Sequence, residues 1–195
     1  KELARHAESL GEDAIAAIPP IYFRLPEYAI AQYWNDISEA APQTDFVIYN
    51  IPQLAGVALT SNLFTEMRKN PRVKNSSMPV QDIQMFCAQA GEDYVIFNGP
   101  DEQFISGRAI GAEGAIGGTY GAMPELFLKM DEFIREGRLE KARNIQYAVN
   151  EIIYKMCSAR GNLYGVIKGI LKINENLDLG GVREPLPGLT NEDLP

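Results

Sequence analysis

The chain has 195 residues, of which 46% are hydrophobic and 23% charged, and its 18 basic and 26 acidic residues give a net charge of -8. This composition is typical of a globular domain with a sizeable core, and it excludes disordered and fibrous chains. The acidic balance argues against a nucleic-acid partner or an anionic membrane surface, and no apolar stretch approaches the roughly 18 residues that span a bilayer.

The residues that most often bind metals or form catalytic triads are scarce. His6 is the single histidine, so neither a histidine-based zinc site nor a Ser-His-Asp triad is expected. Cys87 and Cys157 lack a metal-ligand spacing and fall in helical patterns, which predicts buried, reduced thiols. The segment from Lys1 to Arg5 does not have the pattern of a signal peptide, so we expect a reducing, cytoplasmic location.

Short apolar strand patterns alternate with helical patterns through the first 120 residues. We expect strands at residues 13–18, 46–49 and 94–97, a final short strand with a glycine-rich turn within residues 113–120, and a fifth, short strand leading into Lys74. Helical patterns cover residues 3–10, 26–37, 60–67, 80–90 and 101–107, and Thr60 is a candidate N-cap. Strands and helices that alternate at roughly 25-residue intervals predict parallel strands joined by right-handed crossovers.

From Pro124 onward the pattern is helical only. We expect helices at residues 124–135, 139–160 and 163–174, followed by a proline-containing tail without periodicity. The predicted organisation is therefore an α/β region, residues 1–123, and a C-terminal helical region, residues 124–195. Because a complete eight-stranded barrel needs about 200 residues or more, the pattern permits an open sheet or a partial barrel.

Two candidate reactive residues stand out. The apolar run from Phe46 ends in Tyr49 and is stopped by Pro52, which places a phenol at the carboxyl end of a parallel strand, where α/β folds locate their chemistry. Lys74 could act as an amine nucleophile if burial lowers its pKa from the usual value near 10.4. Taken singly, Lys74 would be a solvated surface residue and Tyr49 a packing residue, so only their joint placement favours an enzyme.

Four motifs in order resemble those of N-acetylneuraminate lyases, within the dihydrodipicolinate synthase family of pyruvate-dependent class I aldolases. The motifs are Tyr49-Asn50-Ile51-Pro52, Lys74-Asn75-Ser76-Ser77, Asn98-Gly99-Pro100-Asp101-Glu102 and Gly117-Gly118-Thr119-Tyr120. Together with the three C-terminal helices they cover nearly the whole chain. The resemblance implies a partial TIM (β/α)8 barrel, about strands 4 to 8, with a C-terminal helical extension.

The resemblance also implies an activity. A family member cleaves N-acetylneuraminate to N-acetylmannosamine and pyruvate through a Schiff base on a lysine, which Lys74 matches, while Tyr49 matches a tyrosine that shuttles the proton. No metal or organic cofactor is expected, and the partners are a sugar-acid substrate, pyruvate and further copies of the chain in a homotetramer. The positions expected to bind substrate are Tyr22, Ser76, Gly99, Asp101, Glu102 and Gly118.

Three departures from the family pattern qualify this expectation. The strands that open the barrel are missing, the strand before Lys74 is about three residues short, and Gly118 replaces a common serine. We therefore expect a truncated chain with impaired activity. A non-catalytic oligomerisation or binding module, and a related pyruvate aldolase with another aldehyde substrate, are the alternatives.

Overall fold

The computed structural model describes residues 1–91 and 93–193. They form two compact units, one made of Lys1–Gly99 and Ser106–Ile116, the other of Pro100–Ile105 and the chain from Gly117 onward. The division at residues 123 and 124 stays a prediction. Among the described residues, no helix is both long and apolar enough to cross a membrane.

The first unit is built on a sheet of five parallel strands whose spatial order is their order in the sequence. The strands are β1 (Ala14–Ala17), β2 (Asp45–Tyr49), β3 (Val73–Ser77), β4 (Ile96–Asn98) and β5 (Gly114–Ala115). Each parallel neighbour requires a crossover, and helices occupy these connections. This confirms the expected α/β class.

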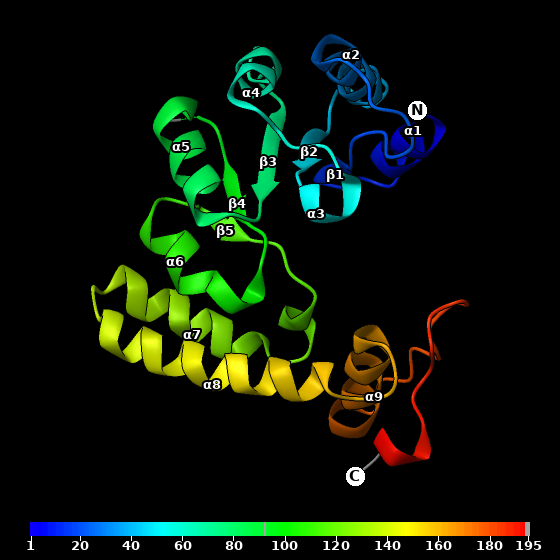
Figure 1. Ribbon diagram of the computed structural model, residues 1–195, viewed down its shortest axis with the longest axis vertical. Coiled ribbons are helices and arrows are strands. Elements are labelled where there is room, and N and C mark those ends of the chain that lie inside the picture. The colour runs from blue at the N-terminus through cyan, green and yellow to red at the C-terminus, as the bar shows by residue number, and fades with distance from the viewer. Residues whose placement is uncertain (92, 194–195) are drawn as a thin grey trace. The chain divides into compact units, whose positions relative to one another are not determined.

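Helices cover one face of this sheet (Figure 1). They include α2 (Glu27–Ser38), α4 (Ser61–Met67) and α5 (Val80–Ala90). Their apolar side chains pack against alternate strand residues in one core, whose largest members include Trp34, Phe46, Ile48, Phe64, Val73 and Phe86. Successive strand residues point to opposite faces of a sheet. The strand residues next to these core residues, such as Val47 on β2 and Lys74 on β3, therefore lie on the face away from the helices.

Local signals place several helices where the sequence predicts them. Thr60 caps α4, since its Oγ1 accepts a hydrogen bond from the Leu63 amide at 3.2 Å. The bounds of α5 match the prediction, and Gly91 follows its last residue with a positive φ of 84°. Helix α1 (Glu2–Ser9) confirms the first helical pattern, and α3 (Pro52–Ala55) is an additional helix that was not predicted.

Three predictions need correction. The strand predicted at residues 13–18 spans only Ala14–Ala17, and Ala14 and Ala16 are exposed because β1 lies at the edge of the sheet. Cys157 is exposed and Cys87 only half-buried, since each lies at the margin of its helix's apolar face. The strand near Lys74 does not end at that residue but starts at Val73 and continues through Ser77.

The second unit is helical. It contains the 3-10 helices η1 (Asp101–Gln103), η2 (Thr119–Gly121) and η3 (Asn191–Asp193), with α7 (Pro124–Arg135), α8 (Leu139–Cys157) and α9 (Leu163–Glu175). The long helices α7 and α8 pack side by side (Figure 1). At the amino end of α7 the rings of Phe104, Tyr120 and Phe127 contact one another edge to face, with centroids 4.1 to 6.1 Å apart. The remaining helix, α6 (Phe104–Ala109), continues from η1 into the first unit.

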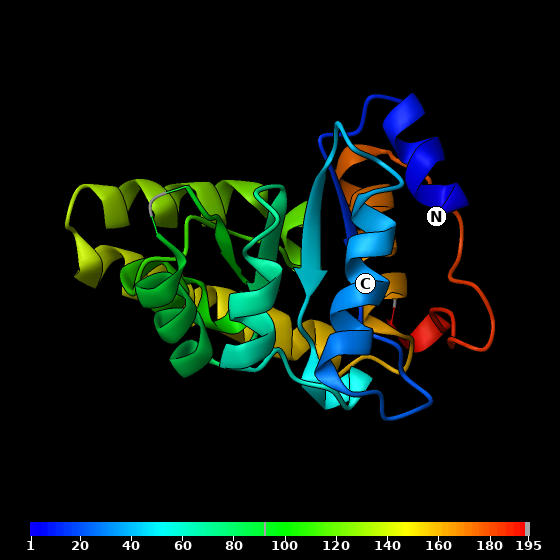
Figure 2. The same ribbon diagram turned by 90° about the horizontal axis from the view of Figure 1, so that it is seen from above.

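The C-terminal tail runs beside α9 (Figure 2). Leu189 packs where Gly161 and Gly169 provide room: a Cβ on Gly169 would lie 2.7 Å from the Leu189 side chain, and one on Gly161 would lie 2.9 Å from the Gly188 carbonyl. The Asp193 carboxylate anchors the tail to the turn between α8 and α9. It accepts hydrogen bonds from the amides of Thr190 at 2.9 Å, Arg160 at 2.8 Å and Gly161 at 3.1 Å.

The Asp193 anchor predicts acid-sensitive tail docking. The hydrogen bonds from the Thr190 and Arg160 amides lower the pKa of Asp193 to about 2 from an ordinary value of 3.8. A depressed carboxyl pKa contributes stability above the ordinary value, and that contribution is lost as the pH falls through about 2. We expect the hydrogen-exchange protection factors of the Arg160 and Gly161 amides to fall as the pH drops from about 4 through about 2, and Asp193→Asn to lower them already at neutral pH. Protection factors measured by NMR that stay constant over this pH range in the parent, and that equal those of Asp193→Asn at neutral pH, would contradict the anchor.

Candidate active site

Polar side chains gather at the carboxyl ends of β2, β3 and β4 in the first unit. Tyr49 ends β2 and pairs in register with Ser76, while Ser77 pairs with Asn98. Since the strands are parallel, their carboxyl ends share one edge of the sheet. The sequence thus correctly located these residues at a single edge.

On the face away from the helices, Tyr49 and Ser76 are neighbours. The Tyr49 side chain is half-exposed, whereas Ser76 is 1% exposed and its Oγ has no hydrogen-bond partner among the described residues. A buried hydroxyl without a partner is costly unless water or a ligand satisfies it. This pair therefore combines a partly exposed phenol with a buried hydroxyl that has no partner among the described residues.

Lys74 lies on the same face of the sheet as Tyr49 and Ser76 but closer to the amino ends of the strands. It is the second residue of β3 and pairs with Val47, two residues before Tyr49 on β2. Its Nζ donates a hydrogen bond to the Pro71 carbonyl at 3.1 Å and lies 3.8 Å from the Asp45 carboxylate. Both partners lie at the amino ends of the strands. The structure therefore brings Lys74 and Tyr49 onto adjacent strands but turns the amine away from the phenol.

A buried hydrogen-bond network supports this edge. Asn50 follows Tyr49, and its Nδ2 donates to Ser77 Oγ at 3.1 Å while its Oδ1 accepts from the Leu59 amide at 3.0 Å. Asn75 also donates to Ser77 Oγ, at 3.0 Å. Both asparagines belong to the motifs of the sequence, but neither was predicted to have a role. Their signal was their position directly after Tyr49 and Lys74, where an amide can link two strand ends.

Gly99 and Tyr22 complete the predicted residues of the first unit. The Gly99 amide donates to the Ser77 carbonyl at 2.9 Å, and a Cβ at Gly99 would lie 3.0 Å from that oxygen, so the backbones approach closely there. Tyr22 is 87% exposed in the loop after β1, and its ring contacts Phe23 edge to face at 4.9 Å. Its side chain therefore lies mostly in solvent.

In the second unit, Asp101 holds a turn. Its buried Oδ2 accepts hydrogen bonds from the Thr119 amide at 2.7 Å and the Thr119 hydroxyl at 2.5 Å. Burial raises the pKa of Asp101, and the Thr119 hydrogen bonds partly oppose that rise. The other oxygen faces Gly117, where an added Cβ would lie 1.5 Å from it. The carboxylate is thus occupied in fixing the Gly117–Thr119 backbone.

Helix α8 holds the backbone around Asp101 and Glu102. The buried Gln146 accepts from the Ile105 amide at 3.0 Å and donates to the Asp101 carbonyl at 3.1 Å, and Asn150 donates to the Glu102 carbonyl at 3.1 Å. The Glu102 side chain is left exposed, and Gly118 lies against the Tyr164 ring. Sequence reasoning missed Gln146 and Asn150, whose spacing of four on one helix was their only signal.

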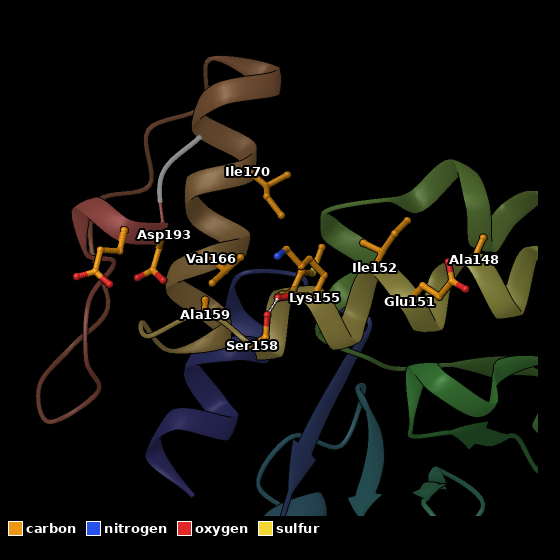
Figure 3. Close-up of a pocket in the computed structure, with 11 residues that line it drawn as sticks. Ala148, Glu151, Ile152, Lys155, Ser158, Ala159, Val166, Ile170 and Asp193 are labelled. Carbon is orange, nitrogen blue, oxygen red and sulfur yellow. Dashed lines mark hydrogen bonds between the residues drawn. The ribbon is translucent and has the colours of Figure 1, made fainter.

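One hollow in the second unit has none of the predicted site residues among its lining residues. It measures about 650 Å³ and lies between α8, α9 and η3, with Ile152, Val166, Ile170, Lys155 and Asp193 among its lining residues (Figure 3). Within residues 1–91 and 93–193, no group of three His, Cys, Asp or Glu side chains is placed to hold a metal ion. The candidate chemistry therefore rests on Lys74, Tyr49 and Ser76.

A parallel sheet with polar groups at its carboxyl ends, covered by helices on one face, defines an α/β-barrel class of protein. A profile of the Dihydrodipicolinate synthetase family matches residues 1–195. The chain belongs to this family, and its five-stranded sheet is part of a TIM barrel.

Relatives within the family are more specific. N-acetylneuraminate lyase of Mediterraneibacter gnavus is 78% identical to this chain, in an alignment that covers 100% of this chain and 62% of the lyase. The N-acetylneuraminate lyase of Lactiplantibacillus plantarum is 31% identical, in an alignment that covers 98% of this chain and 65% of that lyase. The solved wild-type structure of Ruminococcus gnavus sialic acid aldolase is 79% identical, with a TM-score of 0.94 over 98% of this chain and 65% of that one.

These relatives are longer than the chain. The chain spans slightly less than two thirds of each of these proteins. The alignment with the M. gnavus lyase covers 197 positions, two more than the chain has residues, so at least two residues of that relative have no counterpart here.

The close fit of Gly117 around Asp101 predicts that this turn does not tolerate a side chain. We expect Gly117→Ala to destabilise the second unit by about 1–3 kcal/mol, because the methyl group would displace the buried carboxylate. Gly121→Ala is the matched control, since a Cβ there would meet nothing within 4 Å. Denaturant unfolding should separate the two variants, and equal stabilities would show that Asp101 does not fill this space.

Proposed function

We propose that this chain carries the chemistry of an N-acetylneuraminate lyase, cleaving N-acetylneuraminate to N-acetylmannosamine and pyruvate. The observation that carries the proposal is the 78% identity to the M. gnavus N-acetylneuraminate lyase along the whole chain. The chain spans 62% of that protein, so the proposal concerns the roles of the residues that the chain contains and not the full activity of the relative.

Lys74 is the proposed nucleophile. A neutral amine attacks the keto carbon of the substrate, water leaves, and the resulting iminium accepts the electron pair of the carbon–carbon bond as it breaks. Support comes from the sheet position of Lys74 and from the R. gnavus sialic acid aldolase, of which a catalytic lysine mutant has been solved at 78% identity to this chain.

Tyr49 is the proposed proton shuttle. A phenol within hydrogen-bond reach can take the proton of the hydroxyl next to the breaking bond and return it to the released pyruvate carbon. Tyr49 is the last residue of β2, and its pairing with Ser76 places a hydroxyl beside it. The substrate contacts expected at Tyr22, Gly99, Asp101, Glu102 and Gly118 stay predictions, as do a homotetrameric assembly and a cytoplasmic location.

One observation favours a second candidate function. The Lys74 amine is engaged by Pro71 and Asp45 rather than directed at Tyr49. A chain fixed in that arrangement would keep the residues of the family without their reaction, and would act as a binding or oligomerisation module. A related pyruvate aldolase is a third possibility, because Gly118 lacks the hydroxyl that the family commonly presents there.

Trapping with pyruvate separates catalyst from module. We expect incubation with pyruvate and borohydride to leave a reduced adduct on the peptide containing Lys74, detected by mass spectrometry, because borohydride reduces the iminium irreversibly. Lys74→Arg should abolish it while keeping the positive charge. If the adduct forms equally on Lys69 and Lys129, or not at all, the lyase proposal fails and the module remains.

Tyr49→Phe tests the assignment of the shuttle. The variant should still form the pyruvate adduct, since the amine is unchanged, while cleavage of N-acetylneuraminate falls by about 10²- to 10⁴-fold. Released pyruvate, measured with a coupled dehydrogenase, gives the cleavage rate. A variant that cleaves as fast as the parent would remove Tyr49 from the mechanism.

A further inference from the structure

Asp45, Val47 and Tyr49 form a row on the face of β2 away from the helices. They alternate with the core residues Phe46 and Ile48. Lys74 pairs with Val47, the middle member of the row. A strand rises about 3.3 Å per residue, so Asp45 lies about 7 Å below the level of Lys74 and Tyr49 about 7 Å above it. A lysine side chain can reach either neighbour.

In the structure the Lys74 amine lies on the Asp45 side of the row, away from Tyr49. It donates to the Pro71 carbonyl at 3.1 Å and lies 3.8 Å from Asp45 Oδ2. The Lys74 side chain is 13% exposed, whereas that of Asp45 is 49% exposed, so water weakens the attraction. This combination suits a reversible hold better than a fixed ion pair.

We propose that Asp45, with the Pro71 carbonyl, holds the Lys74 amine in a resting position away from Tyr49, and that the amine must leave it to react. Asp45 is then a positioning residue that limits how fast Lys74 reaches a keto substrate. This inference rests on the proposed function, because it gives Asp45 a role toward the Lys74 nucleophile.

The hold and the reaction can be measured separately on the same chain. Limiting acetic anhydride labels free amines without any need for pyruvate, and peptide mapping gives the reactivity of Lys74 relative to Lys129. Pyruvate with borohydride then reports formation of the iminium. The two readouts keep the hold distinct from the chemistry.

Asp45→Asn retains the size of the side chain and removes its charge. We expect it to raise both the labelling of Lys74 and the rate of pyruvate trapping by about two- to fivefold, the range for partly exposed ion pairs. Asp45→Glu should restore low labelling. Glu66→Gln is the matched control, since it removes a carboxylate 2.5 Å from Lys69 in the same unit and should leave Lys74 unchanged.

The outcomes are distinct. Unchanged labelling of Lys74 in Asp45→Asn, or an equal rise in Glu66→Gln, would overturn the inference whatever pyruvate does. A rise in labelling confined to Lys74, with no pyruvate adduct in either protein, would support the hold while refuting the lyase function. A rise in labelling with slower trapping would overturn the positioning role, because Asp45 would then assist the reaction.

Discussion

The pairing register of β2 with β3 is the constraint on which the candidate site depends. Side chains alternate along a strand, so a shift of one residue would turn Lys74 into the helix-covered core and Val73 out of it. The burial of Phe46, Ile48 and Val73 opposes such a shift, because each would lose its apolar contacts. The packing on one face of the sheet thus determines which reactive groups appear on the other.

Much of the fold could be predicted because its signals are local. Helix α5 begins after a proline and ends before a glycine, and α7 begins at Pro124, so their bounds were correct. Strand β3 was harder to predict. Its residues after Val73 are Lys, Asn, Ser and Ser, which have little β propensity, and only pairing with β2 and β4 makes them a strand.

The positions of the predicted residues along the strands were easier to predict than the directions of their side chains. Sequence placed Tyr49 and Ser76 at one edge, since strand ends can be located from apolar runs and the motifs that follow them. It could not predict where the Lys74 amine points, because that depends on Asp45, which is 29 positions earlier in the chain. Likewise, the sequence did not predict the hydrogen bond from the Thr119 amide to the Asp101 carboxylate, because only the folded turn brings these two residues together.

The contacts of Gln146 and Asn150 make the C-terminal helices part of the scaffold of the Asp101–Glu102 turn. Without α8, the Ile105 amide and the carbonyls of Asp101 and Glu102 would lose the partners they have in the structure. A hydrogen bond of this kind contributes about 0.5–1.5 kcal/mol net. In this chain the helical extension therefore helps to fix the Asp101–Glu102 turn and is not an independent appendage.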